Sequence, residues 1–464
     1  MDLDALILSR LQFAFTIAFH IIFPSFTIGL ASFLAVLEGL WLATGRETFK
    51  RLYLFWVKIF AISFGMGVVS GVVLSYEIGA NWSHFAAVAA PVIGPLLAFE
   101  VLTAFFLEAS FLGVMLFGWK KVGRGLHFAS TALVAYGTLV SAFWIVSANS
   151  WMQHPTGFTT LADGTLRATS WMAVIFSPTF PERLAHMTLA AYLTTALVVG
   201  AASAWRLLKG AEAESSIALR MAIGMFALVA PAQLLVGDAA GKRLEEVQPA
   251  KLAAIEAFWE TRTEQAFHIV AWPDRAIAGN RWEISIPKLG SWITAGRADA
   301  ELKGLKAFPP GDRPPVFIVF WAFRVMVGLG VAMIGLGFWG VWLILRGGPE
   351  RSRLFLRAAV AMGPAGFVAV VSGWIVAEVG RQPWVITGVL RTADAVSPVT
   401  AGQVSASLLG FMVVYGVIFS AGVIYILRLI AAGPSLEDEP PRDTGRPPGS
   451  ALGALDAEGH GGQS

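Results

Sequence analysis

The chain has 464 residues, of which 56% are hydrophobic and only 14% charged, and its mean hydropathy is +0.66, values that exclude a soluble domain of this length and indicate a polytopic membrane protein. The net charge of +3 comes from basic residues scattered over short loops, which argues against nucleic-acid binding. Cysteine is absent, so disulfides, thiolate metal sites and cysteine-ligated iron–sulfur clusters are excluded, and a metal would need His, Met or carboxylate ligands.

The first apolar segment is long enough to span a bilayer, and Asp2 and Asp4 stand where a signal peptide would be basic. We therefore expect a retained helix rather than a cleaved leader. A crossing needs about 20 apolar residues. About nine such segments occur, at residues 13–42, 53–79, 95–118, 127–149, 184–205, 219–238, 316–345, 356–379 and 404–431.

These runs lack the alternation of barrel strands, and lipid offers no hydrogen-bond partners to an open backbone. The predicted fold class is therefore all-α. Basic residues gather in alternate connections, which by the positive-inside rule places the N-terminus outside and the C-terminus in the cytoplasm. The bases in these connections are Arg46, Lys50, Arg51, Lys120, Lys121, Arg124, Arg206, Lys209, Arg220, Arg346, Arg351, Arg353 and Arg357.

The order of segments divides the chain into four parts. Residues 1–238 hold helices one to six, and residues 239–315 form a long external loop whose mixture of acids, bases, Trp and Pro suits a folded cap. Residues 316–432 hold the last three helices. Residues 433–464 are rich in Pro, Gly, Ser and charge, which predicts a disordered cytoplasmic tail.

Four potential metal ligands come from four helices. His20 and His186 lie early in the first and fifth segments, Met326 early in the seventh, and Glu378 at the end of the eighth. All four helix ends face outside in the predicted topology, so the side chains would gather at one membrane level. A lone His is often only hydrogen-bonded, and Met is ordinary packing material. Together, His and Met are a known axial pair for low-spin haem, which makes haem the leading cofactor.

Two further acids lie in the third segment. In a regular α-helix, Glu100 and Glu108 would be about 12 Å apart along the axis and roughly 80° apart around it. Intramembrane carboxylates are costly and usually functional, so they suggest a proton relay bridged by water or hydroxyls, with helix–helix hydrogen bonds as the alternative. Lys58, toward the cytoplasmic end of the second segment, could supply this relay or extend its amine to the inner surface.

Seven motifs in order resemble subunit I of the cytochrome bd-type quinol oxidases, over essentially the whole chain before its tail. They are Ser9-Arg10-Leu11-Gln12-Phe13-Ala14 leading to His20, Asn81-Trp82-Ser83, Phe105-Phe106-Leu107-Glu108, Ala148-Asn149-Ser150-Trp151-Met152-Gln153, Lys251-Leu252-Ala253-Ala254-Ile255-Glu256, Phe323-Arg324-Val325-Met326, and Glu378 with Gly380-Arg381-Gln382-Pro383-Trp384.

The resemblance implies three haems. His186 and Met326 stand where the family ligates a low-spin haem b, of the b558 type. His20 and Glu378 stand at the axial positions of a high-spin haem b and a haem d, in an order left open here. Glu100 also belongs to this site, as a ligand or a proton donor.

Other residues surround these positions. Trp374, one turn before Glu378, resembles the family's aromatic residue between haems. Four arginines, Arg10, Arg324, Arg381 and Arg391, are expected near the external level, where guanidinium groups can balance propionate charge.

The long loop resembles the family's quinol-binding loop, in which Lys251 and Glu256 match positions implicated in quinol oxidation. A carboxylate can take a quinol proton while a lysine polarises the other oxygen. A solvated helix face is the alternative for this pair. The loop lacks the large insertion of longer relatives, so the chain resembles the short-loop class, which includes cyanide-insensitive oxidases, and the haem in the d site could be d or b.

The sequence thus predicts the catalytic subunit of a terminal oxidase in a bacterial cytoplasmic membrane. Quinol would be oxidised outside, and O2 reduced to water with cytoplasmic protons, separating charge without a pump. The resemblance implies a second membrane subunit and a small single-helix accessory subunit, with lipid around them. Two alternatives stay open: a proton-coupled transporter without metal, and a b-type cytochrome with a different electron acceptor.

Overall fold

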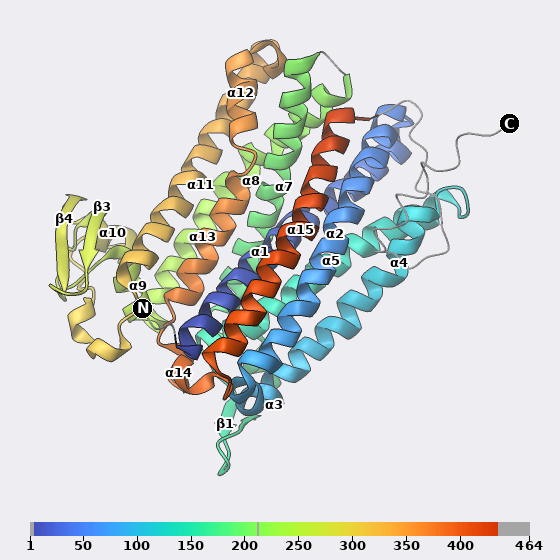
Figure 1. Ribbon diagram of the computed structural model, residues 1–464. Coiled ribbons are helices and arrows are strands. Elements are labelled where there is room, and N and C mark those ends of the chain that lie inside the picture. Colours follow the sequence, from blue (N-terminus) through green and yellow to red (C-terminus); the bar gives the residue numbers. More distant parts are fainter. Residues whose placement is uncertain (1–3, 211–212, 435–464) are drawn as a thin grey trace.

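The computed structural model describes residues 4–210 and 213–434. The predicted tail, apart from Gly433 and Pro434, lies outside these residues. Within them, nine helical segments are long and apolar enough to cross a membrane. This confirms the expected all-α membrane fold. Figure 1 shows the long helices side by side in one bundle.

The first six crossings cover the N-terminal half of the chain. They are α1 (Ala5–Thr44), α2 (Glu47–Asn81), the continuous run of α3 (Ser83–Glu100), a π-helical turn (Val101–Phe105) and α4 (Phe106–Phe117), then α5 (Arg124–Gln153), α7 (Phe180–Lys209) and α8 (Ala213–Val247). The short elements between α5 and α7 are the hairpin β1 (Phe158–Thr160) with β2 (Leu166–Ala168), and α6 (Trp171–Ile175).

The segment after α8 folds at one end of the bundle. It contains α9 (Pro249–Glu256), the antiparallel hairpin of β3 (Phe267–Asp274) and β4 (Gly279–Ile286), α10 (Leu289–Ala295) and two 3-10 turns (Leu305–Ala307 and Pro310–Asp312). It is therefore a folded unit rather than a linker. Because α8 continues to Val247, it begins later than residue 239.

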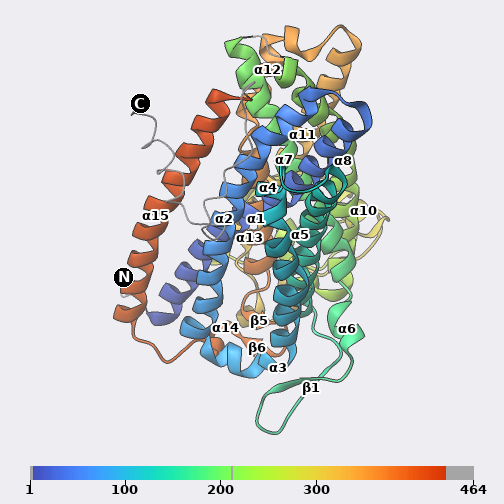
Figure 2. The same ribbon diagram turned by 90° about the vertical axis from the view of Figure 1, so that its right-hand side faces the viewer.

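The last three crossings are α11 (Val316–Leu345), the pair α12 (Arg353–Ala361) and α13 (Ala365–Val379), and α15 (Ala401–Ala432). A 3-10 turn (Pro349–Arg351) precedes α12, and β5 (Trp384–Ile386), β6 (Leu390–Arg391) and α14 (Thr392–Ala395) follow α13. We call the end of the bundle where α5 and α13 finish the Glu378 end. It is the lower end in Figures 1 and 2, where β1 and α14 lie, and the β3–β4 hairpin projects from the side of the bundle next to α9.

Most helices are longer than the apolar runs that predicted them. Asp4 caps α1, accepting a hydrogen bond from the Ile7 amide at 2.7 Å, so the helix starts well before residue 13. Likewise, the third crossing starts at Ser83 instead of residue 95. Hydropathy marks only the part of a helix suited to lipid, whereas caps decide where the helix begins. His20 consequently lies well inside α1, contrary to its expected place near the helix start.

The largest apolar cluster fills the half of the bundle away from Glu378. Its largest buried side chains include Leu34, Tyr53, Trp56, Phe226 and Phe355. In α1 it begins at Phe26, in α7 at Leu193 and in α11 at Met333. The helix segments beyond these residues, toward the Glu378 end, carry the predicted site.

Candidate functional site

Three predicted ligands occupy one layer of the bundle. His20 precedes Phe26 by six residues, and His186 and Met326 precede Leu193 and Met333 by seven each, where Phe26, Leu193 and Met333 mark the edge of the apolar cluster. α1, α7 and α11 all run inward from the Glu378 end (Figure 1). Similar spacings, of six or seven residues from a common edge, therefore place the three side chains at a similar depth.

Each of the three faces a glycine of a neighbouring helix. A Cβ on Gly71 of α2 would lie 3.2 Å from His20 Cε1, and one on Gly237 of α8 would lie 3.2 Å from His186 Cε1. A Cβ on Gly373 of α13 would lie 3.1 Å from Met326 Sδ. Glycine thus provides room against each side chain where an ordinary residue would crowd it.

The hydrogen bonds of the two histidines suit metal ligation. His20 Nδ1 lies 2.9 Å from Ser70 Oγ, and that hydroxyl donates to the Gly67 carbonyl. His20 therefore donates from Nδ1, which leaves a lone pair on Nε2. His186 Nδ1 is buried without a hydrogen-bond partner among the described residues. Both side chains fit the haem ligation that the sequence suggests.

Glu378 ends α13 inside a polar cluster. Its Oε1 accepts hydrogen bonds from Asn149 at 2.9 Å and Gln153 at 3.3 Å, both on α5, and its Oε2 pairs with Arg381. Arg183, on α7, donates to Asn149 Oδ1. Arg381 keeps Nε and Nη1 buried and without partners in the described structure, so it has donors to spare for another anion. Such donors suit a haem propionate.

Among the described residues, no hydrogen bond or ion pair joins any two of His20, His186, Met326 and Glu378. Each contacts its own neighbours, as separate axial positions would. Sequence reasoning overlooked Arg183, which lies one turn before His186 within α7 and not in the preceding loop. Asn149 and Gln153 were part of a recognised motif, and only the fold shows that their side chains contact Glu378.

Lys251 joins this cluster from α9. It is almost fully buried, and its ammonium donates to Gln153 Oε1, the residue whose amide nitrogen also reaches Glu378. Burial, with Arg183 and Arg381 nearby, holds the pKa of Lys251 well below its ordinary value. The alternative that Lys251 lies on a solvated helix face is therefore wrong. The Gln153 side chain contacts both the Lys251 amine and the Glu378 carboxylate.

Glu256, at the other end of α9, forms a buried ion pair with Arg324. Arg324 Nη2 donates to Glu256 Oε2 at 2.8 Å and to the His268 carbonyl at 2.7 Å. The two side chains are only 8% and 10% exposed, so neither lies on a solvated face. Arg324 lies two residues before Met326, and its Nη1 is buried with no partner in the described structure.

His268 of β3 completes this arrangement, and the sequence reasoning missed it. Its Nδ1 donates to the Glu256 carbonyl at 2.7 Å, and its Nε2 lies 3.2 Å from Glu283 Oε2 on β4. Both ring nitrogens of His268 therefore lie close to oxygen acceptors. His268 of the hairpin thereby contacts the backbone of Glu256, while Arg324 contacts the Glu256 side chain and the His268 carbonyl.

The π-helical turn changes the relation between Glu100 and Glu108. Two α-helical turns take about 7.2 residues, so one inserted residue brings positions eight apart onto one face. Ser141 of α5 donates to Glu100 Oε1 at 2.7 Å, and a Cβ on Gly137, one turn earlier in α5, would lie 2.7 Å from Glu108 Cγ. The expected angle of roughly 80° is therefore wrong, because it assumed a regular α-helix.

Glu108 is buried, and its Oε1 has no hydrogen-bond partner among the described residues. A buried carboxyl oxygen inside the membrane that has no hydrogen-bond partner needs another explanation, and proton transfer is one. The alternative of two simple helix–helix hydrogen bonds accounts for Glu100 through Ser141 but not for this oxygen.

The remaining predicted residues lie on α1, α2 and α13 and in β6. Arg10 is exposed near the start of α1, and Lys58 and Trp374 are half-buried on α2 and α13. Arg391 pairs with Asp312 at 2.6 Å and stacks on Trp384.

Two buried acids, Glu77 and Glu38, were not among the residues predicted from the sequence. Thr16 donates to Glu77 Oε2 at 2.6 Å between α1 and α2, near the Glu378 end. Toward the other end, His127 Nδ1 lies 2.7 Å from Glu38 Oε1. The sequence signal for each was an acid inside an apolar run, within four residues of the end of that run.

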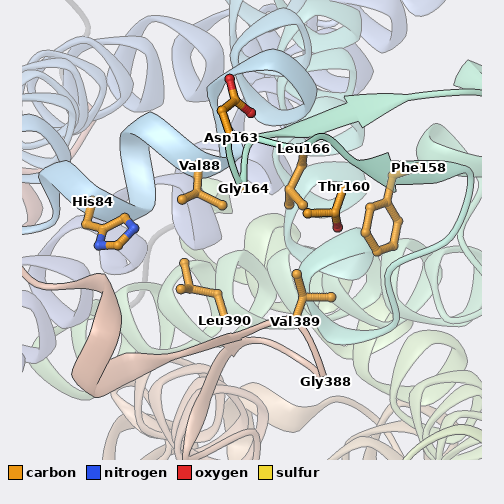
Figure 3. A pocket seen from close by; sticks show the side chains of 10 residues that line it. All are labelled: His84, Val88, Phe158, Thr160, Asp163, Gly164, Leu166, Gly388, Val389 and Leu390. Atoms are coloured by element: carbon orange, nitrogen blue, oxygen red, sulfur yellow. The ribbon is translucent and has the colours of Figure 1, made fainter.

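A cavity of about 380 Å³ opens at the Glu378 end between the β1–β2 hairpin and the turn after β5. Figure 3 shows His84 at the left of its wall and Asp163 at the top, with Val88 between them. None of the predicted site residues lines it. It is therefore a separate surface feature.

Comparisons with known proteins relate the whole chain to one family. The family model described as "Cytochrome bd terminal oxidase subunit I" matches residues 8–434. The chain is 36% identical over 445 residues to "Cytochrome bd ubiquinol oxidase subunit 1" of Bacillus subtilis (strain 168), covering 93% of this chain and 94% of that protein. It is 33% identical over 510 residues to "Cytochrome bd-II ubiquinol oxidase subunit 1" of Escherichia coli (strain K12), covering 94% and 99%.

Structure comparison gives the same result. The bd oxidase structure from Geobacillus thermodenitrificans matches with a TM-score of 0.87 and 30% identity, over 93% of this chain and 99% of that one. Both the sequence and the fold agree along nearly their whole length. The chain therefore belongs to the family of cytochrome bd terminal oxidase subunit I.

Proposed function

We propose that this subunit oxidises quinol at the outer membrane face and delivers the electrons to oxygen, which is reduced to water with protons from the cytoplasm. Its family makes it a multi-pass, haem-carrying subunit of a quinol:oxygen oxidoreductase. Members of this family pair with a subunit II. The proposal adds the residues, the sidedness and the proton route.

One observation carries the proposal: the two predicted quinol residues each connect to a predicted haem-ligand position. Glu256 pairs with Arg324, two residues before Met326, and Lys251 shares Gln153 with Glu378. A substrate bound at α9 would therefore lie next to the groups that must receive its electrons. A proton-coupled transporter would have no need of this adjacency.

Quinol gives up two protons as its electrons leave. Glu256 is placed to accept one, because it is a buried carboxylate on α9 that Arg324 holds in position through an ion pair at 2.8 Å. Lys251 is placed to donate a hydrogen bond to the second oxygen, and its lowered pKa allows it to lose its charge when the substrate displaces water. The protons would leave on the outer side.

His186 and Met326 would hold the low-spin haem b, while His20 and Glu378 would hold the high-spin haem b and the haem d, in an order left open. When bound, haem supplies electron transfer and the reduction of O2. Arg324 and Arg381, which retain buried unpartnered donors, would orient and balance propionates, with Arg10 and Arg391 farther out.

Glu100 and Glu108 would carry protons inward to the reduction site from the cytoplasm, with Lys58 near the entry. The support is their common orientation toward α5 and the unpartnered oxygen of Glu108. Proton uptake and release on opposite faces would generate proton-motive force without a pump. Charge separation of this kind requires the N-terminus outside, as basic-residue distribution predicts.

Several finer assignments complete the proposal. The membrane would be a bacterial cytoplasmic membrane, and a small single-helix accessory subunit would join subunit II. The loop class would be the short one, related to cyanide-insensitive oxidases. Trp374 would lie between haems.

The test is a reduced-minus-oxidised absorption spectrum of the purified complex, with analysis of the extracted haems and oxygen consumption on added quinol. Low-spin and high-spin bands with quinol-dependent oxygen uptake are expected. A colourless protein would favour the transporter, whereas haem bands without oxygen uptake would favour a b-type cytochrome with another acceptor.

A further inference from the structure

The β3–β4 hairpin carries its apolar side chains on the outside. Ile269 and Trp272 of β3, with Trp282, Ile284 and Ile286 of β4, are 43% to 59% exposed. We call these five side chains the hairpin face. In a water-soluble hairpin packed on a core, the apolar face would be the buried one. Here the arrangement is reversed.

The opposite side of the same hairpin makes polar contacts with the end of α9 and with the residues that follow it. His268 donates to the Glu256 carbonyl, and Asn280 accepts from Trp259 Nε1 at 2.9 Å while donating to the Ala257 carbonyl at 3.3 Å. These contacts fix which way the hairpin faces. The exposure of the hairpin face is therefore built into the fold and does not result from a loosely attached loop.

The hairpin face continues onto a membrane-spanning helix. The Trp272 ring packs on Phe317, the second residue of α11, with centroids 5.0 Å apart, and on Trp282 at 6.4 Å. Phe317 and Ile318 are themselves exposed, and the most apolar part of the α11 crossing is only 17% buried. An apolar surface running from a membrane helix onto a hairpin extends the surface that meets lipid.

The other hairpin at this end offers a comparison within the same molecule. β1 and β2 present Thr159, Thr160 and Arg167 outward, as a hairpin in water should. Figure 1 shows β1 extending beyond the end of the bundle, whereas β3 and β4 project sideways next to α9 and α11. The composition of each hairpin therefore matches its position: the β3–β4 hairpin, beside the bundle, exposes apolar side chains, and the β1–β2 hairpin, beyond its end, exposes polar ones.

We infer that the hairpin face is inserted in lipid at the membrane–water interface of the Glu378 end. Tryptophans with an apolar ring and a polar N–H favour that depth, and burying large apolar side chains there is favourable by about 25 cal/mol per Å² of apolar surface. The occupant is the bilayer surface itself. Resting on the proposed function, this places Glu256 at the level where a lipid-soluble quinol arrives.

The absence of cysteine in this chain permits a direct test. Ile284→Cys in the whole oxidase complex is labelled with an environment-sensitive fluorophore, in nanodiscs of phosphatidylcholine and phosphatidylglycerol. Quenching is compared between a lipid with a nitroxide near the top of its acyl chain and aqueous iodide. Thr159→Cys on the polar hairpin is the matched control, and unsubstituted complex corrects for label on partner subunits.

The label at position 284 should lose fluorescence to the nitroxide lipid and be protected from iodide, while the label at 159 should show the reverse. Iodide quenching at 284 equal to that at 159 would overturn the inference, since the face would then lie in water. Protection at 284 from both quenchers would also overturn it, because a protein partner would cover the face. Neither quenching measurement depends on oxidase activity. The proposed function is tested independently by the haem spectrum and by quinol-dependent oxygen uptake.

Discussion

Glu256→Gln tests whether Glu256 acts as a base or only as a structural ion-pair partner. The substitution keeps the shape of the side chain but leaves the Arg324 guanidinium buried without a carboxylate, with only the neutral His268 carbonyl as acceptor. Breaking a buried ion pair in this way costs about 3–5 kcal/mol. Loss of a general base lowers the rate by a further factor of about 10² to 10⁴.

The two effects separate in a double-mutant cycle with Arg324→Met. Thermal stability of the complex, kcat/KM for quinol and the haem spectrum are measured for both single variants and the double variant. Removing the stranded charge should restore most of the stability lost in Glu256→Gln. The double variant should nevertheless oxidise quinol more slowly than Arg324→Met alone, because the base is still missing.

Two results would refute this reasoning. If the double variant matched Arg324→Met in kcat/KM, Glu256 would have no role beyond the ion pair. If Glu256→Gln alone lost neither stability nor activity, the buried pair itself would not contribute as its geometry indicates. The haem spectrum serves as a control, because Arg324 is only two residues from Met326 and its substitution could lower activity by disturbing haem binding.

Four other changes have defined outcomes. Met326→Leu should abolish the low-spin band in the reduced-minus-oxidised spectrum and leave the high-spin bands, whereas loss of every band together would contradict the ligand assignment. Gly237→Val should diminish the same low-spin band by crowding the proposed histidine ligand, while Gly241→Val, whose Cβ would meet nothing within 4 Å, should leave it intact. Glu108→Gln should slow oxygen reduction at normal haem content, and unchanged turnover would remove this residue from the relay. The pKa of Lys251 is lowered in the folded chain, so between that pKa and about 10.5 the folded chain binds fewer protons than the unfolded chain. The free energy of unfolding therefore rises with pH in this range, by at most about 1.4 kcal/mol per pH unit. Lys251→Met should make the rise of Tm with pH less steep, and an unchanged slope would contradict this explanation.

The number of crossings and the family could be predicted from the sequence. A bilayer demands long apolar helices, so the nine segments are visible in composition alone. Costly residues in those helices, such as Glu378 and Glu108, stand out against the apolar background. The motifs around them then indicated the family, which the comparisons confirm.

Helix boundaries and relative orientations were less accessible. A single π-helical turn rotates Glu108 relative to Glu100, and no hydropathy pattern reports it. Gln153 connects Lys251 and Glu378 although the two are 127 positions apart in the chain. Such contacts depend on which helices pack together, a property that spacing along one helix does not contain.

The sequence by itself thus determined the membrane character of the chain, its helices and the chemical types of its site residues, because the solvent acts on each segment separately. Tertiary structure alone decided that Glu100 and Glu108 share a helix face and that His268 donates a hydrogen bond to the Glu256 carbonyl. It also decided that the β3–β4 hairpin exposes its apolar side chains. These depend on contacts between segments distant in sequence, and their energies arise only when the helices meet.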